Sequence, residues 1–216
     1  MNRRRFFGLA GTSLAGFAAS TLLGCRGQQV GEVMKDNKKD LVGNTAAGAE
    51  TYKPLIDEAL GKLLARQGAG LQPVSAPVPA PKRICFVGLE NKSSEEIGDF
   101  KEQIIETIDT RISTSQTFSQ VSRKFTEAGL REARLRPDEL FLPAKQRQFL
   151  AVMESAGAPF DYLLFATVTS GTTRSTSDNT QKDYMLTLEL VNIQTGTPDK
   201  ESASIRKGYR KSHGLR

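Results

Sequence analysis

The chain has 216 residues, 25% of them charged and 38% apolar, which is typical of one globular domain of ordinary size with additional segments. Its two cysteines cannot build a disulfide scaffold or a four-thiolate zinc site, and a single histidine, His213, argues against a His-based catalytic triad. The net charge is +6 but falls to +3 without residues 1–24, which hold three arginines and no acidic residue, so nucleic acid is not expected as a partner.

The N-terminal segment has the order of an export signal. Arg3, Arg4 and Arg5 provide positive charge, and an uncharged run follows over residues 6–24. This run is diluted by Gly and Ala, and it is at the short end of the ~20 residues that a bilayer-spanning helix needs. We therefore predict a signal peptide over residues 1–24 rather than a membrane-spanning helix.

Two resemblances add detail to this prediction. Residues 2–7 (NRRRFF) resemble the twin-arginine export motif, although three arginines also suit the general secretory pathway. Residues 22–25 (LLGC) resemble a bacterial lipobox, in which the signal peptide is cut before the cysteine and a diacylglycerol is joined to its sulfur. This resemblance implies that Cys25 is the lipid attachment site and that acyl chains hold the protein at a membrane. The alternative is an uncleaved signal anchor in which Cys25 is an ordinary buried thiol.

The next segments differ in composition. Residues 25–49 are polar and poor in large apolar side chains, which predicts a flexible, lipidated tether. Apolar residues at helical spacing predict an amphipathic helix over residues 50–67. Residues 68–81 contain four prolines and indicate an extended linker. A globular domain is expected over residues 82–211.

Within this domain, residues 84–89 predict a buried strand in which Cys85 acts as a small apolar residue, because no histidine lies near it. Ser93 and Glu96 predict a capping box at the start of a helix that continues to Ile112. The remaining expected elements are a strand over 118–121, helices over 122–134 and from Pro143, strands over 160–169, 184–193 and 203–206, and a long polar loop over 171–183. This order predicts an α+β fold with a small, mostly antiparallel mixed sheet flanked by helices.

Sequence motifs for chemistry are missing. The chain has no phosphate-binding loop, dinucleotide-binding turn, zinc-protease motif or nucleophile elbow, so we predict no catalytic residue, metal ligand or cofactor. Binding is instead expected at loops and exposed strand faces. The polar loop over residues 171–183 is one candidate, and its alternative role is a hairpin connection without function.

Several short segments occur in the order typical of a known family. They are residues 87–93 (VGLENKS), 118–122 (FSQVS), 158–164 (APFDYLL), 188–196 (LELVNIQTG) and 205–207 (IRK). Together with the lipobox-like segment, this succession resembles the LpoB family of lipoproteins, which activate bifunctional penicillin-binding proteins. The resemblance spans residues 52–211. The chain departs from the family in the Pro-rich segment after its first helix and in lacking a Trp in its last strand.

The resemblance implies a non-enzymatic lipoprotein that binds and activates a peptidoglycan synthase, a penicillin-binding protein. It implies a location at the cell outer membrane, anchored by lipid and facing the periplasm. Arg26, rather than an aspartate, follows Cys25, and this favours the outer membrane by the sorting rule of enteric bacteria. The alternatives are an envelope lipoprotein of similar fold in outer-membrane assembly or secretion, and an enzyme.

Overall fold

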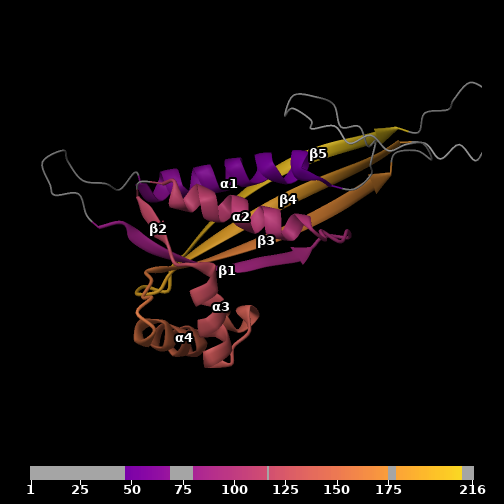
Figure 1. The fold of residues 1–216 in the computed structure, drawn as a ribbon. Helices are drawn as coiled ribbons and strands as arrows, with labels where there is room; N and C mark the ends of the chain where they lie inside the picture. Colours follow the sequence, from indigo (N-terminus) through magenta and orange to yellow (C-terminus); the bar gives the residue numbers. More distant parts are fainter. Residues whose placement is uncertain (1–46, 69–79, 116, 175–178, 211–216) are drawn as a thin grey trace, which may run out of the picture. The chain divides into compact units, whose positions relative to one another are not determined.

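The computed structural model describes residues 47–68, 80–115, 117–174 and 179–210 (Figure 1). The elements described below belong to one unit, Gly43–Arg216. The signal peptide, Cys25, nearly all of the tether and most of the Pro-rich linker lie outside the described residues, so these assignments stay predictions.

The elements follow the expected order of one helix and then β-α-β-α-α-β-β-β, with an added 3-10 helix. The helices are α1 (Ala49–Gly68), α2 (Phe100–Ser113), α3 (Arg123–Ala133), the 3-10 helix η1 (Pro137–Phe141) and α4 (Pro143–Ser155). The strands are β1 (Lys82–Lys92), β2 (Phe118–Gln120), β3 (Tyr162–Arg174), β4 (Asn179–Asn192) and β5 (Pro198–Arg210).

The fold is α+β, and these strands form one mixed sheet in the order β2-β1-β3-β4-β5. The pairs β1–β2 and β1–β3 are parallel, whereas β3–β4 and β4–β5 are antiparallel. The expectation of a mostly antiparallel sheet is therefore wrong in this detail. The connections explain this mixture. Parallel neighbours need a crossover, and here α2 connects β1 to β2 while α3 and α4 connect β2 to β3. Strands β3, β4 and β5 follow one another directly and pair as antiparallel hairpins.

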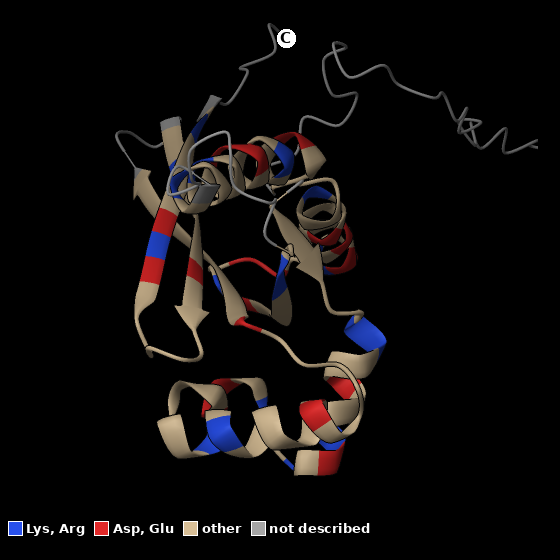
Figure 2. Ribbon diagram, turned by 90° about the vertical axis from the view of Figure 1, so that its left-hand side faces the viewer, with Lys and Arg blue, Asp and Glu red and all other residues tan. Residues whose placement is uncertain are grey.

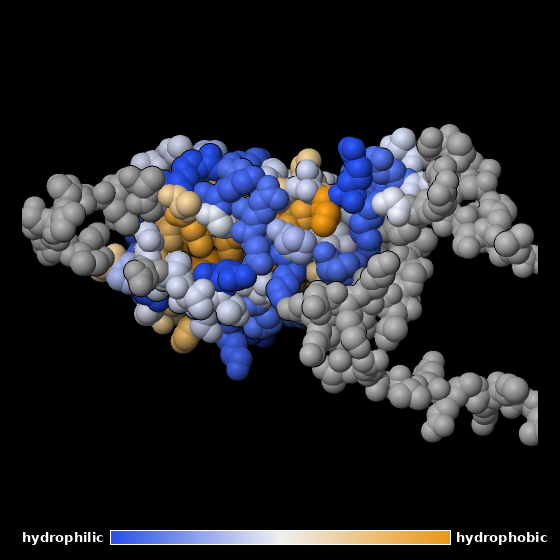
Figure 3. Space-filling view, turned by 90° about the horizontal axis from the view of Figure 1, so that it is seen from above, coloured by the Kyte–Doolittle hydropathy of each residue, from blue (hydrophilic) through white to orange (hydrophobic). Residues whose placement is uncertain are grey.

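One face of the sheet, the covered face, packs against α1 and α2 (Figures 1 and 2). Its core joins apolar side chains of both helices to every second residue of β4. Its members include Leu55, Ile56, Leu60, Leu63, Ile104, Ile108, Ile112, Tyr184, Leu186, Leu188 and Leu190. The surface of this layer is mostly hydrophilic, with apolar patches between the polar side chains (Figure 3), as expected of amphipathic helices.

The opposite face packs against α3, η1 and α4 near one end of the sheet only (Figure 1). A second core forms there from Cys85, Val87, Leu130, Leu140, Phe149, Met153, Leu163, Phe165 and Val191. Gly129 lets α3 approach α4 closely, because a Cβ atom at this position would run into Met153 Sδ and lie 3.1 Å from Phe149 Cε2. Beyond this second core the sheet carries polar side chains, and this part is the open face.

The predicted capping box at Ser93 is wrong. Helix α2 begins later, at Phe100, with Asp99 as its N-cap. Ser93 instead donates hydrogen bonds to the Asn91 side-chain oxygen from its hydroxyl (2.7 Å) and its backbone N–H (2.9 Å). Short polar side chains often close such local turns in competition with helix caps, and here the turn is followed by a helix that begins only at Phe100.

The predicted polar loop over residues 171–183 is wrong for residues 171–174 and 179–183, because β3 continues to Arg174 and β4 begins at Asn179; residues 175–178 lie outside the described residues. Gly171 pairs with Asp183, and Thr173 pairs with Gln181. Residues 171–173 are exposed, so this end of the hairpin lacks the alternation of apolar and polar side chains that marks a half-buried strand. The backbone pairing of β3 with β4 nevertheless continues from the buried residues into this exposed end.

Candidate functional site

The two cysteines of the sequence have separate places. Cys25, the predicted lipid attachment site, lies outside the described residues. Cys85 is fully buried in β1, as predicted, with its Sγ 3.3 Å from Thr126 Oγ1. Burial raises the pKa of the Cys85 thiol to about 12, so the thiolate is scarce at neutral pH.

The described part of the chain offers neither a metal centre nor a membrane span. It contains no group of three or more His, Cys, Asp or Glu side chains arranged to hold a metal ion. None of its helices combines the length and the apolar character needed to cross a membrane.

The structure does contain a groove along one edge of β1, which the sequence patterns did not indicate. Strand β2 is only three residues long, and its pairing with β1 stops where Ile84 lies beside Gln120. The pairing of β1 with β3 continues to Lys92. Residues 86–92 therefore have a neighbouring strand on one side only, and the groove, of about 540 Å³, lies beside residues 86–90 between α2 and the α3–η1 segment.

A β-bulge shapes this edge. The register of β1 against β3 shifts between Phe86 and Gly88, so that Val87 is the extra residue. Gly88 has a φ of 151°, a conformation that favours glycine, and no heavy atom outside its immediate chain neighbours lies within 4 Å of a Cβ atom built there. A glycine inside an otherwise apolar strand is the one signal in the sequence that could have indicated this site.

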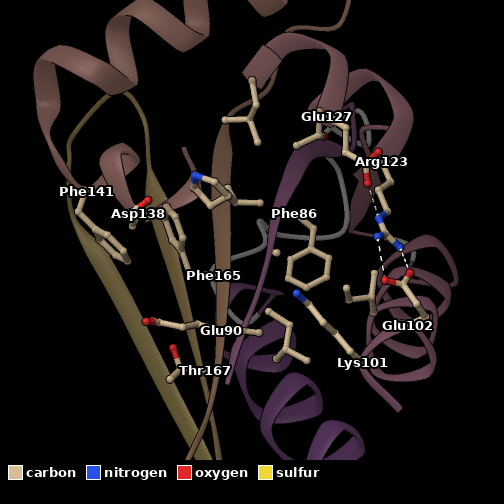
Figure 4. A pocket seen from close by; sticks show the side chains of 18 residues that line it. Phe86, Glu90, Lys101, Glu102, Arg123, Glu127, Asp138, Phe141, Phe165 and Thr167 are labelled. Atoms are coloured by element: carbon tan, nitrogen blue, oxygen red, sulfur yellow. Dashed lines mark hydrogen bonds and ion pairs between the residues drawn. The ribbon is translucent and has the colours of Figure 1, made fainter. Parts of the chain in front are cut away.

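Two aromatic rings form one wall of the groove. Phe141, from η1, stacks on Phe165, from β3, with ring centroids 4.4 Å apart and an interplanar angle of 25°. Phe165 is buried, whereas Phe141 is 52% exposed. Figure 4 shows the two rings side by side, with Asp138 next to them and Glu90 nearby. Half of a large apolar side chain therefore remains open to a binding partner.

An ion-pair cluster forms the opposite wall. Arg123, at the start of α3, donates to Glu102 of α2 at 2.6 Å and to Glu127 of α3 at 2.8 Å (Figure 4). The hydrogen bond from Arg123 holds the pKa of Glu102 below its usual range. The lining of the groove carries four carboxylates, Glu90, Glu102, Glu127 and Asp138, against two cations, Lys101 and Arg123. The groove is therefore apolar at one wall and acidic in its balance of charge.

The open face offers a second, flatter surface. Its exposed or half-exposed side chains are mostly small, polar or charged: Thr167, Thr169, Met185, Thr187, Glu189, Lys200, Ser202, Ser204 and Arg206. Lys200 and Glu189 form an ion pair at 2.7 Å across two strands. The structure thus has an exposed strand face, and residues 171–174 and 179–183 belong to its strands rather than to a loop.

These features describe an α+β module that presents surfaces for contact and keeps its one described thiol inert. The chain belongs to the LpoB family: a sequence model described as peptidoglycan-synthase activator LpoB matches residues 70–198. The family is one of activators, which regulate a synthase rather than replace it.

Three solved structures are similar to parts of this chain. The C-terminal domain of LpoB from Salmonella enterica shares 15% identity at a TM-score of 0.47, covering 69% of this chain and 97% of that one. Lipoprotein GNA1162 from Neisseria meningitidis shares 21% identity at a TM-score of 0.44, covering 62% of this chain and 88% of that one. The PelC dodecamer from Paraburkholderia phytofirmans shares 14% identity at a TM-score of 0.31, covering 63% of this chain and 79% of that one. All three TM-scores lie below 0.5, so the assignment to the family stands on the sequence match alone. No curated protein matches the sequence.

Proposed function

We propose that this chain is a lipid-anchored protein of the cell envelope that binds a penicillin-binding protein and activates its synthesis of peptidoglycan. The membership of residues 70–198 in the LpoB family carries this proposal, because the family is named for the activation of a peptidoglycan synthase. The lipobox-like residues 22–25 support an anchor at Cys25, and Arg26 directly after it favours the outer membrane, with the chain facing the periplasm.

In this proposal the protein acts by contact and without a cofactor. An activator changes a synthase only through a difference in its affinity for two states of the enzyme, so it needs a stable surface of defined shape. The five-stranded sheet with helices on both sides is suited to hold such a surface, and the groove and the open face are two available parts of it.

Reconstitution tests the activation. The full chain in detergent is titrated into a purified bifunctional penicillin-binding protein while glycan-chain formation is followed, with the full chain alone as the control for its own activity. We expect saturable stimulation and no turnover by the chain alone. Failure to bind or stimulate any envelope synthase would remove the proposal. Crosslinking in cells to a component of outer-membrane assembly or secretion would favour the alternative.

Metabolic labelling tests the anchor separately. Cys25→Ser should abolish incorporation of labelled palmitate and leave uncleaved precursor, because the lipid is joined to the sulfur of this residue. Cys85→Ala is the matched control, since Cys85 is buried in β1 and its loss should not affect labelling. Normal labelling and processing of Cys25→Ser would contradict the assignment.

A further inference from the structure

Strand β1 has a free edge that the rest of the described chain does not use. The backbone of residues 86–90 pairs with β3, and within the described residues it has no backbone partner on its other side. Such an edge presents unpaired N–H and C=O groups at the spacing of a strand. Native proteins usually cover a free edge, and here α2 and α3 flank it without filling the groove.

We propose that this edge binds an extended peptide segment of a partner protein, which adds to the sheet as a strand and continues the position that β2 occupies beside residues 82–84. Main-chain hydrogen bonds to β1 would supply affinity, as in other complexes formed by strand addition. At ~3.3 Å per residue, the free edge along residues 86–90 accommodates a segment of about five residues.

The side chains around the edge define the chemistry of this segment. Phe141, half exposed and stacked on Phe165, provides an apolar wall for one or two of its side chains. Glu90 and Asp138 lie beside the same wall (Figure 4). Their ion-pair partners, Lys92 and Arg136, do not line the groove. The segment is therefore one that alternates apolar residues with at least one Lys or Arg, whose charge complements the carboxylates.

The opposite wall makes an acidic segment a poor fit. Arg123 joins α3 to α2 through Glu102, with a second pair of atoms at 3.3 Å in addition to the one at 2.6 Å. This two-point contact keeps the guanidinium engaged and unavailable as a site for an anion. The contacts of Arg123 occupy Glu102 and Glu127, so the lining is left with two carboxylates, Glu90 and Asp138, against one cation, Lys101, and its balance of charge stays negative.

The proposal is tested by selecting random twelve-residue peptides, displayed on phage, for binding to the full chain. The affinity of each selected peptide is then measured for the natural chain and for three variants. Phe141→Ala removes the aromatic wall, Glu90→Lys reverses a lining charge, and Leu142→Ala is the matched control because Leu142 is 56% exposed beside Phe141 but does not line the groove. Loss of a central anchor side chain weakens binding by about tenfold or more, so we expect that loss for the first two variants and none for the control.

Two further measurements distinguish strand addition from nonspecific peptide binding. A central Pro in a selected peptide removes a backbone donor and should weaken binding by about tenfold. Bound peptide should slow amide hydrogen exchange at residues 86–90 of β1 and leave β5 unchanged. Peptides that bind Phe141→Ala as well as the natural chain, protection elsewhere, or a library without specific binders would overturn the proposal. These results are independent of the proposed function, since the synthase assay tests activation whether or not the groove is used.

Discussion

Strand β4 faces two environments, and its two sides differ in almost every residue. On the covered face, Tyr184, Leu186, Leu188 and Leu190 are at most 1% exposed beneath the helical layer. On the open face, the alternate residue Met185 is exposed, and Asp183, Thr187 and Glu189 are half-buried. Because strand side chains alternate between faces, one strand serves both as a core element and as a surface.

The difference shows where the stability of the fold resides. Each large apolar side chain buried on the covered face contributes about 1.5–3 kcal/mol relative to an exposed one, whereas polar side chains of the open face leave their hydration almost unchanged. The covered face therefore stabilises the sheet. The open face and the groove along β1 remain available for binding.

The largest expected effect is a loss of core packing on the covered face. Leu188→Ala should lower the free energy of unfolding by about 2–5 kcal/mol, because Leu188 is fully buried and its truncation leaves a cavity. The control is its neighbour on the open face, where Thr187→Ala should change this free energy by no more than about 1 kcal/mol. Urea unfolding followed by circular dichroism measures both. Equal losses at the two positions would mean that the open face is covered in solution.

Two glycines extend the comparison to the helical layers. Gly129→Ala should destabilise the protein by about 1–3 kcal/mol, because the added Cβ atom would collide with Met153 and crowd Phe149 across the α3–α4 contact. Gly61→Ala in α1 meets no atom within 4 Å and should stabilise the helix by about 0.5–1 kcal/mol. Thermal and urea unfolding distinguish the two signs, and stabilisation by Gly129→Ala would show that the two helices separate easily.

A charged contact at the end of the covered face should make stability depend on pH. Glu95, in the β1–α2 connection, accepts hydrogen bonds from the Ala47 backbone and the Tyr184 hydroxyl, each at 3.0 Å, and pairs with Lys182. Burial acts to raise the pKa of Glu95, but the hydrogen bonds from Lys182, Ala47 and Tyr184 together lower it. A carboxyl whose pKa is lower in the folded state adds stability above its unfolded pKa and loses it as the pH falls.

We therefore expect the natural chain to lose stability as the pH falls below about 4.5, the ordinary value for Glu, and Glu95→Gln to lose less over the same interval. Urea unfolding between about pH 6 and about pH 3, which brackets this transition, measures the two slopes. Glu96→Gln, at the next residue, is the control and should retain the slope of the natural chain. Parallel slopes for Glu95→Gln and the natural chain would show that this contact does not form in solution.

The sequence predicted the order of elements because each one carries a periodic apolar pattern or a clear breaker, such as Pro143 at the start of α4. It did not predict the parallel pairing of β1 with β3, which depends on where the helices between them pack. The strand residues 171–174 and 179–183 were not predicted for a different reason: the exposed residues among them, 171–173, carry no pattern that distinguishes a strand from a loop.

The groove could not have been predicted from local patterns. It exists because β2 ends after three residues while β1 continues, which is a relation between segments distant in the sequence. Gly88 was visible as a glycine in an apolar strand, but only the structure shows that the bulge lies at a free edge. Phe141 gave no signal either, because the sequence around a phenylalanine in a short 3-10 helix does not show whether its side chain is exposed or buried.

The smallest expected effect concerns Arg123, which connects α3 on one side of the sheet to Glu102 of α2 on the other. Its side chain is 32% exposed and that of Glu102 is 61% exposed, so water and salt screen the pair. Arg123→Gln should lower the urea midpoint slightly at low ionic strength. The difference should vanish in about 1 M NaCl, where the screening length is about 3 Å.

Lys124→Gln is the matched control for this prediction, because Lys124 is the exposed neighbour in the same helical turn and its loss should have no such salt dependence. A loss of stability for Arg123→Gln that persists in high salt would mean that this side chain packs the two layers together. The two faces of the sheet would then be joined by a structural connection across the edge of β1, and a segment bound in the groove would contact both layers at once.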